Sequence, residues 1–501
     1  MGKIQSQIII ITAALLAVSC SRQTMSVEEL RVEHMENPAV VDATHPRLSW
    51  INIPKSQKAR GIKQTAYRIV VASSKENLKQ GIYDLWDSGK QLSEESDLIP
   101  YQGKTLPSAQ DCYWKVQTWD QDGKPTAWSK PSYWGMGIMN ENEWQAQWIA
   151  PLLGGPGAPL LRKHFDSEGQ IKQAKVFVCG LGYFELYVNG ERIGDDYLVP
   201  NMTDYTKRFD LEKGPIAISG NMSRHRVMYL AYDITKQIQE GRNALGVILG
   251  NGFYDAVNLN IPCSKFGDEC LRLQLQLTYA DGTTQTVISD NTWETKPSAI
   301  TLNGVHAGEI YNANLETPLW ATTEDNSQGW QRVKCIEGPT GMMTAHTAPT
   351  DKIVETLKPI SLHQREDGAW VVDFGKEISG WLHLHDLKGE KGDTVKVDYI
   401  SESVQGNMRY VMNGSGSEDY APRFTWFAFS KAVISGVKEL SMRNLTADVV
   451  NTHVEKTADF HTTDTLFNRI NEIWQRSQLD NMHGGIASDC PHRERLPYTG
   501  D

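Results

Sequence analysis

The stretch Leu271-Arg272-Leu273-Gln274-Leu275-Gln276-Leu277 alternates leucine with a polar side chain at every step. Successive side chains of a β-strand point to opposite faces of its sheet, so this period of two predicts a strand with one apolar face and one face in water. The turn pair Asp281-Gly282 follows the strand. The pattern favours a mainly β fold, and the segments on either side extend the same prediction.

Three further runs precede this strand. Residues 176–182 and 184–188 are rich in β-branched and aromatic side chains, and the pair Asn189-Gly190 after them is a strong hairpin turn. Residues 245–252 form another apolar run with glycines near its end. Together these runs predict a β-sandwich module over residues 145–340.

The N-terminal side of the chain shows the same pattern. Ala66–Ala72 and Tyr113–Trp119 have the β-branched and aromatic content of strands, and turn residues 120–123 follow the second run. About 100 residues with strands of this length are typical of an immunoglobulin-like or fibronectin-III-like sandwich. We predict such a module over residues 27–140 and expect it to be a spacer without chemistry.

The C-terminal side begins as β structure and then changes. Several short runs predict a third β module over residues 345–454; they are 370–375, 380–384, 395–399 and 423–429. At Thr463 the period becomes helical, because Asp464 can cap a helix and apolar residues recur on one face at Leu466, Ile470, Ile473 and Trp474. The breaker Met482-His483-Gly484-Gly485 follows this amphipathic helix.

Length, charge and cysteines limit the class of protein. With 501 residues the chain should contain about three or four domains. The net charge is −11 and no Lys/Arg cluster occurs, which argues against nucleic acid as a partner. No Cys/His set has the spacing of a zinc site, so no metal site is predicted. Cys263 and Cys270 either close a small loop as a disulfide or are two buried thiols.

The first residues have the pattern of an export signal. Lys3 gives a basic start, an apolar run covers residues 8–18, and Ala17-Val18-Ser19-Cys20 ends it. The run is too short for a mature transmembrane helix and fits a signal peptide over residues 1–20. The small residues before Cys20 resemble a bacterial lipobox, which implies lipidation of Cys20, a lipid anchor in a membrane, and an exported lipoprotein of the periplasm or outer membrane. A plain secretory signal with an incidental cysteine is the alternative.

Residues 487–501 gather chemically active side chains. They include three carboxylates, Asp489, Glu494 and Asp501, with two arginines, a histidine and Tyr498. Two prolines and a glycine in this segment predict a loop. Glycosidases need a protonated carboxylic acid beside the leaving oxygen and a second carboxylate across the sugar ring. From the residues alone, this loop is either part of a sugar site or a solvated, charge-rich surface.

The order of these side chains resembles a known signature. Asp489-Cys490-Pro491-His492-Arg493-Glu494-Arg495-Leu496 with Tyr498-Thr499-Gly500-Asp501 is similar to the signature loop of glycoside hydrolase family 78, the bacterial α-L-rhamnosidases. Further motifs similar to this family occur earlier in the family's order: Leu85-Trp86-Asp87-Ser88-Gly89, Tyr113-Trp114-Lys115-Val116, Tyr187-Val188-Asn189-Gly190, Gly194-Asp195, Gly308-Glu309-Ile310-Tyr311-Asn312-Ala313, Val372-Asp373-Phe374-Gly375, Gly380-Trp381 and Pro422-Arg423-Phe424-Thr425. The resemblance covers essentially all of the chain after the leader.

The resemblance assigns roles within the loop. It implies that Glu494 is the general acid, that Asp489 and Arg493 line the rhamnose pocket, that Tyr498 is an aromatic wall of the pocket, and that Asp501 is another pocket carboxylate. Neighbouring carboxylates raise the pKa of a general acid and so keep its proton near neutral pH. Many family members have one more acidic residue before the glutamate and a glycine at the position of Pro497, so the role of Glu494 depends on the alignment.

The resemblance also implies a fold and a reaction. It predicts tandem sandwiches, of which the later ones are carbohydrate-binding-like jelly rolls, followed by an (α/α)6 barrel whose first helix or two occupy residues 455–501. The implied reaction is inverting hydrolysis of terminal non-reducing α-L-rhamnose from glycans or glycosides, with no cofactor required; calcium in the carbohydrate-binding-like module is left open without assigned ligands. The family's general base does not occur in this sequence, so the chain as written is expected to be truncated and inactive alone. The alternative is a carbohydrate-binding lipoprotein without catalysis.

Overall fold

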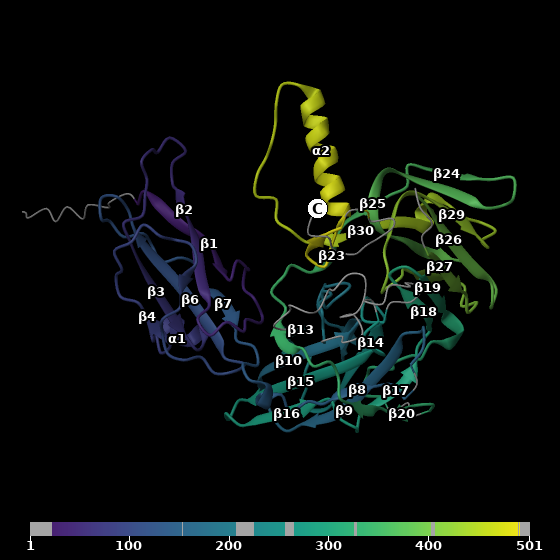
Figure 1. The fold of residues 1–501 in the computed structure, drawn as a ribbon, viewed down its shortest axis with the longest axis horizontal. Helices are drawn as coiled ribbons and strands as arrows, with labels where there is room; N and C mark the ends of the chain where they lie inside the picture. Colours follow the sequence, from purple (N-terminus) through teal and green to yellow (C-terminus); the bar gives the residue numbers. More distant parts are fainter. Residues whose placement is uncertain are drawn as a thin grey trace, which may run out of the picture. The chain divides into compact units, whose positions relative to one another are not determined.

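The computed structural model describes residues 23–152, 154–206, 225–255, 265–324, 328–401, 406–488 and 490. They form two compact units, shown with their elements in Figure 1. The first unit comprises the described residues up to 37 with 45–105 and 111–134, and the second comprises 38–44, 106–110 and the described residues from 135 onward. Strands dominate both units, which confirms the mainly β class predicted from the sequence.

The first unit is a sandwich of two antiparallel sheets. Their strand orders are β1-β2-β5 and β4-β3-β6-β7. In β6 every second side chain points into the core, and Trp114 among them is fully buried. The elements are β1 (Met25–Val32), β2 (Arg47–Pro54), β3 (Ala66–Ala72), α1 (Lys75–Gln80), β4 (Trp86–Asp87), β5 (Ile99–Pro100), β6 (Asp111–Trp119) and β7 (Ser132–Gly135).

Two sheets of the second unit share one core and together make up its jelly-roll part. Their strand orders are β21-β8-β15-β10-β13-β22, with β16 paired to β15, and β12-β11-β14-β9-β17-β20. Val178 and Leu273 from the first of these sheets are buried in one cluster with Leu186 and Val247 from the second. The elements are η1 (Glu141–Glu143), β8 (Trp148–Ala150), β9 (Pro159–Ser167), β10 (Ile171–Leu181), β11 (Tyr183–Val188), β12 (Glu191–Arg192), β13 (Arg226–Asp233), β14 (Gly241–Gly250), β15 (Cys270–Tyr279), β16 (Thr284–Ile288), β17 (Glu294–Pro297), β20 (Gln331–Arg332), β21 (Lys334–Ile336) and β22 (Met342–Ala345).

β15 differs from its sequence prediction on one face. Its leucines are buried as expected, but Arg272 and Gln274 are buried as well, so the predicted water-facing side is wrong for this half of the strand. The segment that follows η1 covers them. The Gln145 N–H donates to Gln274 Oε1 at 2.8 Å, and Arg272 Nε donates to the Ala146 carbonyl at 3.0 Å. These hydrogen bonds make the burial of both polar side chains tolerable.

A third sheet is built mainly from residues 351–452. Its strand order is β18-β19-β27-β26-β29-β25-β30-β23, with β24 and β28 paired to β25. β18 and β19 come from residues 300–312, and β19 runs parallel to β27. The elements are β18 (Ile300–Gly304), β19 (Gly308–Asn312), η4 (Ala313–Leu315), β23 (Asp351–Leu357), β24 (Ser361–Gln364), β25 (Trp370–Leu387), β26 (Thr394–Ile400), β27 (Asn407–Val411), β28 (Glu418–Tyr420), β29 (Phe427–Ser435), η5 (Met442–Asn444) and β30 (Leu445–Thr452).

The predicted amphipathic helix is present as α2 (Thr465–Asp480), drawn in yellow in Figure 1. Asp464 caps it by accepting a hydrogen bond from the Leu466 N–H at 2.8 Å. The apolar side chains of α2 are half to two-thirds exposed, whereas Asp480 at its end is buried. A short hairpin follows, formed by β31 (Met482–His483) and β32 (Ile486–Ala487). None of the helices in the described part of the chain is long and apolar enough to cross a membrane.

Candidate functional site

The predicted catalytic and substrate-binding residues follow the β31–β32 hairpin in the sequence. Asp489, Arg493, Glu494, Tyr498 and Asp501 lie outside the described residues, and so does Cys20. The structure describes the chain continuously from 406 to Ser488. The candidate site is therefore built from the residues that hold the hairpin directly before the signature segment.

The hairpin turns at two glycines. Gly484 and Gly485 have φ angles of 64° and 79°, a left-handed conformation that residues with a side chain rarely adopt. The sequence prediction of a break in the helix here is confirmed, and the break is a tight reversal. The Ser488 N–H donates to the Asn481 carbonyl at 2.8 Å and closes the base of the hairpin.

The His483 side chain connects this hairpin to three other segments of the chain. Its Nδ1 lies 2.7 Å from Asp351 Oδ2 at the start of β23, and its Nε2 lies 3.0 Å from Ser379 Oγ on β25. Its ring stacks on Trp426, with 4.3 Å between the ring centroids and 27° between the planes. Three segments that are far apart in the sequence therefore meet at one imidazole.

Backbone groups of the turn are bound to the third sheet as well. Asp351 Oδ1 accepts from the Gly484 N–H at 3.0 Å and from the Thr452 hydroxyl at 2.8 Å. The Gly485 N–H in turn donates to Thr452 Oγ1 at 2.9 Å. The carbonyl of Gly484 accepts from Asn201 Nδ2 at 2.6 Å. Both glycines of the turn are thus fixed by directional hydrogen bonds.

Asp480 adds a second anchor at the end of α2. Its Oδ1 accepts from the Ser379 N–H at 3.1 Å, so Ser379 contacts both Asp480 and His483. Burial raises the pKa of the Asp480 carboxyl to about 7, and Arg476 opposes this only in part. Near neutral pH this buried carboxyl is close to its point of protonation.

Sequence reasoning did not select any of these supporting residues. The pattern of Met482–Gly485 predicts only a break in the helix, although the histidine within it is a local signal of a polar contact. Asp351 carries no local signal, because it is 132 positions from its partner in the chain. Only the folded sheet places the two side chains together.

Three of the motifs quoted from the sequence meet in a second buried cluster. Glu309 accepts from the Tyr420 hydroxyl at 2.9 Å and from the Arg423 N–H at 3.0 Å. The Arg423 guanidinium reaches back to the jelly-roll sheet, where it pairs with Glu185 and donates to Tyr187 Oη at 2.7 Å. Burial raises the pKa of Glu309 to about 7, whereas that of Glu185 is lowered because Arg423 and Arg192 outweigh its burial. This cluster joins the jelly-roll part to the third sheet.

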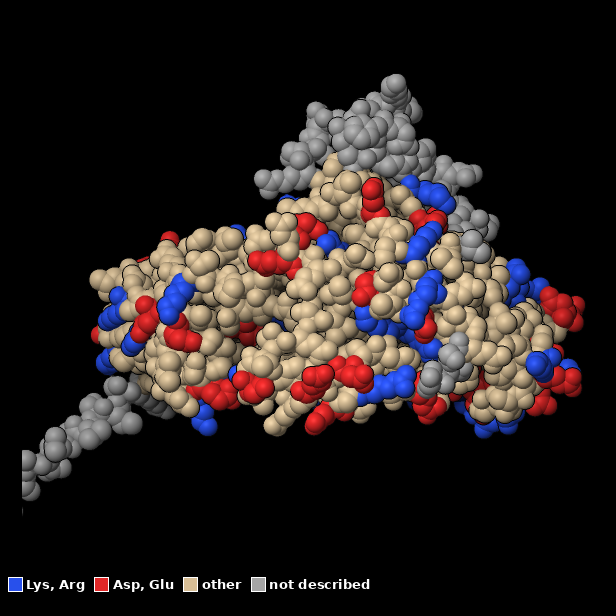
Figure 2. Space-filling view, turned by 90° about the horizontal axis from the view of Figure 1, so that it is seen from below, with Lys and Arg blue, Asp and Glu red and all other residues tan. Residues whose placement is uncertain are grey.

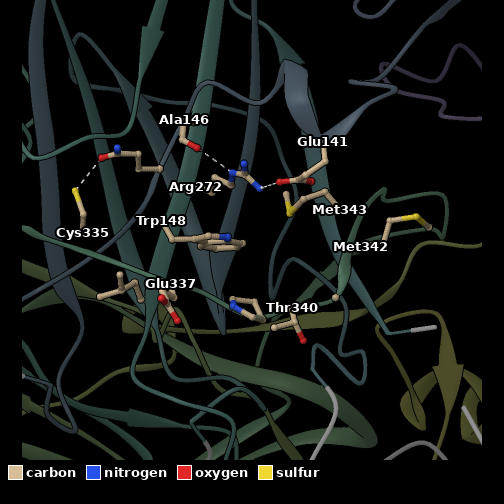
Figure 3. A pocket seen from close by; sticks show the side chains of 13 residues that line it. Glu141, Ala146, Trp148, Arg272, Cys335, Glu337, Thr340, Met342 and Met343 are labelled. Carbon is tan, nitrogen blue, oxygen red and sulfur yellow. Dashed lines mark hydrogen bonds and ion pairs between the residues drawn. The ribbon is translucent and has the colours of Figure 1, made fainter. Parts of the chain in front are cut away.

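A pocket of about 790 Å³ opens in the jelly-roll part (Figure 3). The indole of Trp148 lies centrally in this view, with Arg272 on one side and Glu337 and Thr340 on the other. Arg272 forms an ion pair with Glu141 at 2.5 Å. The pocket thus offers an aromatic surface together with charged and hydroxyl groups.

Candidate metal clusters and the charge of one face of the molecule were compared with the sequence predictions. No group of three or more His, Cys, Asp or Glu residues within the described ranges could hold a metal ion. In the face shown by Figure 2, the described Lys and Arg side chains are interspersed with Asp and Glu rather than gathered. Cys270 is a free, buried thiol, which favours the two-thiol alternative, while Cys263 lies outside the described residues.

Comparison with protein families assigns most of the chain between residues 27 and 501. Residues 27–140 match the Rha78A-like N-terminal immunoglobulin domain, and residues 169–216 and 221–355 match the alpha-L-rhamnosidase N-terminal domain. Residues 363–451 match the bacterial alpha-L-rhamnosidase concanavalin-like domain, and residues 455–501 match the bacterial alpha-L-rhamnosidase 6 hairpin glycosidase domain. The chain belongs to the bacterial α-L-rhamnosidase family. The resemblance stated from the sequence is confirmed.

Individual relatives of this rhamnosidase family agree. An alpha-L-rhamnosidase of Formosa agariphila is 31% identical over 97% of this chain and 54% of its own length, and one of Streptomyces avermitilis is 24% identical over 94% and 62%. The solved α-L-rhamnosidase of Dictyoglumus thermophilum superposes with a TM-score of 0.85 at 32% identity, over 95% of this chain and 54% of that one. The Aspergillus terreus enzyme superposes with a TM-score of 0.84 at 25% identity, over 95% and 55%. The chain spans about half the length of the curated relatives it matches.

Proposed function

We propose that the complete product of this gene is an inverting α-L-rhamnosidase that releases terminal non-reducing α-L-rhamnose from glycans or glycosides. The observation that carries the proposal is the match of four rhamnosidase domains in one order, with the last match containing the signature segment 489–501. The solved relative from Streptomyces avermitilis is described as complexed with L-rhamnose, which supports the substrate class. In this proposal Glu494 is the general acid, and Asp489, Arg493, Tyr498 and Asp501 hold the sugar.

The chemistry defines what each group does. In an inverting glycosidase one carboxylic acid protonates the leaving oxygen while a second carboxylate activates water on the opposite face of the sugar. Glu494 would give its proton to the glycosidic oxygen. The supporting hairpin, fixed by His483 and the Asp480 carboxyl, gives the signature segment a rigid starting point, and a small displacement of a catalytic group is costly to rate.

The test is Glu494→Gln in the complete gene product. The amide keeps the size of the side chain and much of its hydrogen bonding, but it cannot donate the proton. We expect kcat on natural rhamnosides to fall by about 10²–10⁴-fold, the usual contribution of general acid catalysis. Aryl rhamnosides with good leaving groups should lose less, because their leaving oxygen needs less protonation.

The matched control for this test is Glu366→Gln, which changes an exposed glutamate in the β24–β25 turn. Its rates should equal those of the wild type. Near wild-type hydrolysis of natural rhamnosides by Glu494→Gln would place the acid elsewhere, with Asp489 and Asp501 as the next residues to change.

We also propose export as a lipoprotein anchored through Cys20. The basic start, the short apolar run and the small residues before Cys20 support it. A lipid chain adds membrane affinity with each buried methylene, so wild-type protein should sediment with membranes and Cys20→Ala should be released as soluble protein. Wild-type protein that is soluble after lysis would contradict the anchor.

We further propose that the Trp148 pocket binds a saccharide, in addition to the binding at the catalytic residues. Its size, its indole and its charged rim support this, since flat aromatic surfaces and hydrogen-bonding groups suit sugar rings. Calorimetric titration with L-rhamnose should detect binding by this chain, and Glu337→Ala should weaken it several-fold. Equal affinity in Glu337→Ala and in the exposed control Glu366→Ala would exclude this pocket as the site.

A further inference from the structure

The hydrogen bonds around His483 determine where its protons lie. Ser379 has one hydroxyl proton, and it donates this proton to the Val450 carbonyl at 2.7 Å. A carbonyl oxygen can only accept, so Ser379 Oγ must use a lone pair toward His483 Nε2, 3.0 Å away. Nε2 therefore carries a hydrogen.

The other ring nitrogen faces a carboxylate. Nδ1 lies 2.7 Å from Asp351 Oδ2, a distance typical of a charge-assisted hydrogen bond. The second oxygen of Asp351 already accepts from the Gly484 N–H and the Thr452 hydroxyl, and two donors favour the ionised form of a carboxyl. Since an imidazole is ordinarily more basic than a carboxylate, the shared proton belongs on Nδ1.

The surroundings suit a cation at this position. The His483 side chain is 10% exposed and that of Asp351 is 1% exposed, so the attraction between them is weakly screened. The face of Trp426 against the ring supplies the negative part of an aromatic quadrupole. Among the described residues, titratable groups near the hairpin include Asp480, which accepts from the Ser379 N–H and faces Arg476, and His346, which accepts a hydrogen bond from the Asn201 N–H at 3.3 Å.

We propose that His483 is a positioning residue, held as a doubly protonated imidazolium between Asp351 and Ser379, that fixes the hairpin preceding the signature segment. The role in positioning catalytic groups rests on the proposed rhamnosidase function, whereas the protonation state and the rigidity of the hairpin do not. Both of these can be measured on this chain without any activity, so failure of the inference and failure of the proposed function are separable.

The first measurement is long-range ¹H–¹⁵N correlation NMR on the full chain with ¹⁵N-labelled histidine at pH 7.5. His483→Gln identifies the signal of His483 by its loss, and His363→Gln, an exposed histidine on β24, is the matched control. We expect both ring nitrogens of His483 to have the shifts of protonated nitrogens, and we expect these signals to persist in His363→Gln. A single protonated nitrogen at His483 would overturn the inference.

The second measurement is amide hydrogen exchange of peptides spanning residues 481–488. Ser379→Ala removes the acceptor of the Nε2 proton together with the hydroxyl's own hydrogen bond to the Val450 carbonyl, and it is the milder variant if His483→Gln does not fold. We expect exchange in this segment to rise about tenfold or more in Ser379→Ala, as for loss of one hydrogen bond to a charged group. Peptides of β6 should not change. Unaltered exchange at 481–488 in a folded variant would refute the positioning role.

Discussion

At the scale of single residues, the described part of the chain contains buried carboxyl groups whose pKa values differ from those of the same groups in water. Asp480 and Glu309 are carboxyls whose pKa burial raises to about 7. Glu185 is equally enclosed, yet its pKa is lowered because Arg423 and Arg192 surround it. Burial disfavours the charged form in all three. Arg423 pairs directly with Glu185 and outweighs the burial there, whereas Arg476 near Asp480 and Arg423 near Glu309 offset it only in part.

The raised pKa of Asp480 makes stability depend on pH in a definite direction. Between about pH 4 and pH 7 the folded protein keeps a proton on this carboxyl that the unfolded chain has released. The free energy of unfolding therefore falls as pH rises through this window, and the full penalty is present above pH 7. Each pKa unit corresponds to about 1.4 kcal/mol, which sets an upper limit of about 4 kcal/mol.

Asp480→Asn should remove this penalty, because the amide oxygen can still accept from the Ser379 N–H but the side chain cannot ionise. We expect the variant to equal the wild type near pH 4 and to exceed it by about 1–3 kcal/mol at pH 8 in urea unfolding. Asp367→Asn, at an exposed position, is the control and should give a flat difference. A constant difference between wild type and Asp480→Asn across this range would disprove the assigned cause.

At the scale of elements, helix α2 agrees with its sequence prediction in position, cap and amphipathic pattern. Residues 453–461 before it are all exposed and contain no strand. The apolar side chains of α2 are also exposed, so the anchor of this region within the described residues is the hairpin after the helix rather than the helix itself. Such a segment opens locally at a lower free energy than the sheet beside it.

Limited trypsin digestion should therefore cut after Lys456 earlier than at any other lysine or arginine in the described residues. Its only ion pair there is the surface contact with Asp459, which offers little protection. Lys456→Gln should delay the appearance of the corresponding fragments in mass spectra. Earlier cleavage within β23 to β30 would contradict this order of local stability.

At this scale, the sequence predicts features that depend on neighbouring residues, but it does not predict contacts between segments that are far apart in the chain. The cap and period of α2 are local, and so is the alternation of β15, so both elements were predicted. The buried polar face of β15 was not, because the backbone that covers Gln274 at residues 143 and 145 lies about 130 positions earlier. Asp351 and Ser379 were not predicted for the same reason, because each lies more than 100 positions from His483 in the chain. The catalytic candidates were predicted because they belong to one contiguous motif that resembles a known family.

At the scale of the whole molecule, the two compact units should unfold as separate cooperative transitions. A shortened chain of residues 26–454 lacks the hairpin. Asp351 and Ser379, which both belong to the second unit, therefore lose their hydrogen bonds to His483 and Asp480. In calorimetry we expect it to fold with β-type circular dichroism, but with the transition of the second unit lowered by about 5–10 °C.

The first unit is the internal control of this experiment, because its transition should be unchanged. A non-cooperative melt of the shortened chain would mean that the β sheets need the residues after 454 to fold at all. An unchanged transition of the second unit would mean that the hairpin contributes nothing to its stability.

The cluster of Glu185, Glu309 and Arg423 has a consequence for recombination between relatives. Its members are spread over 238 positions, and residues 300–312 leave the jelly-roll sheets to pair beside β27. A recombination crossover near residue 345 would exchange the third sheet after that residue between two relatives. Glu185 and Glu309 would then face the other protein's residue at the position of Arg423. A chimera whose grafted third sheet lacks a cation at the position of Arg423 would bury unmatched charge, which is strongly destabilising. The jelly-roll part and the third sheet should therefore be inherited, and engineered, as one piece.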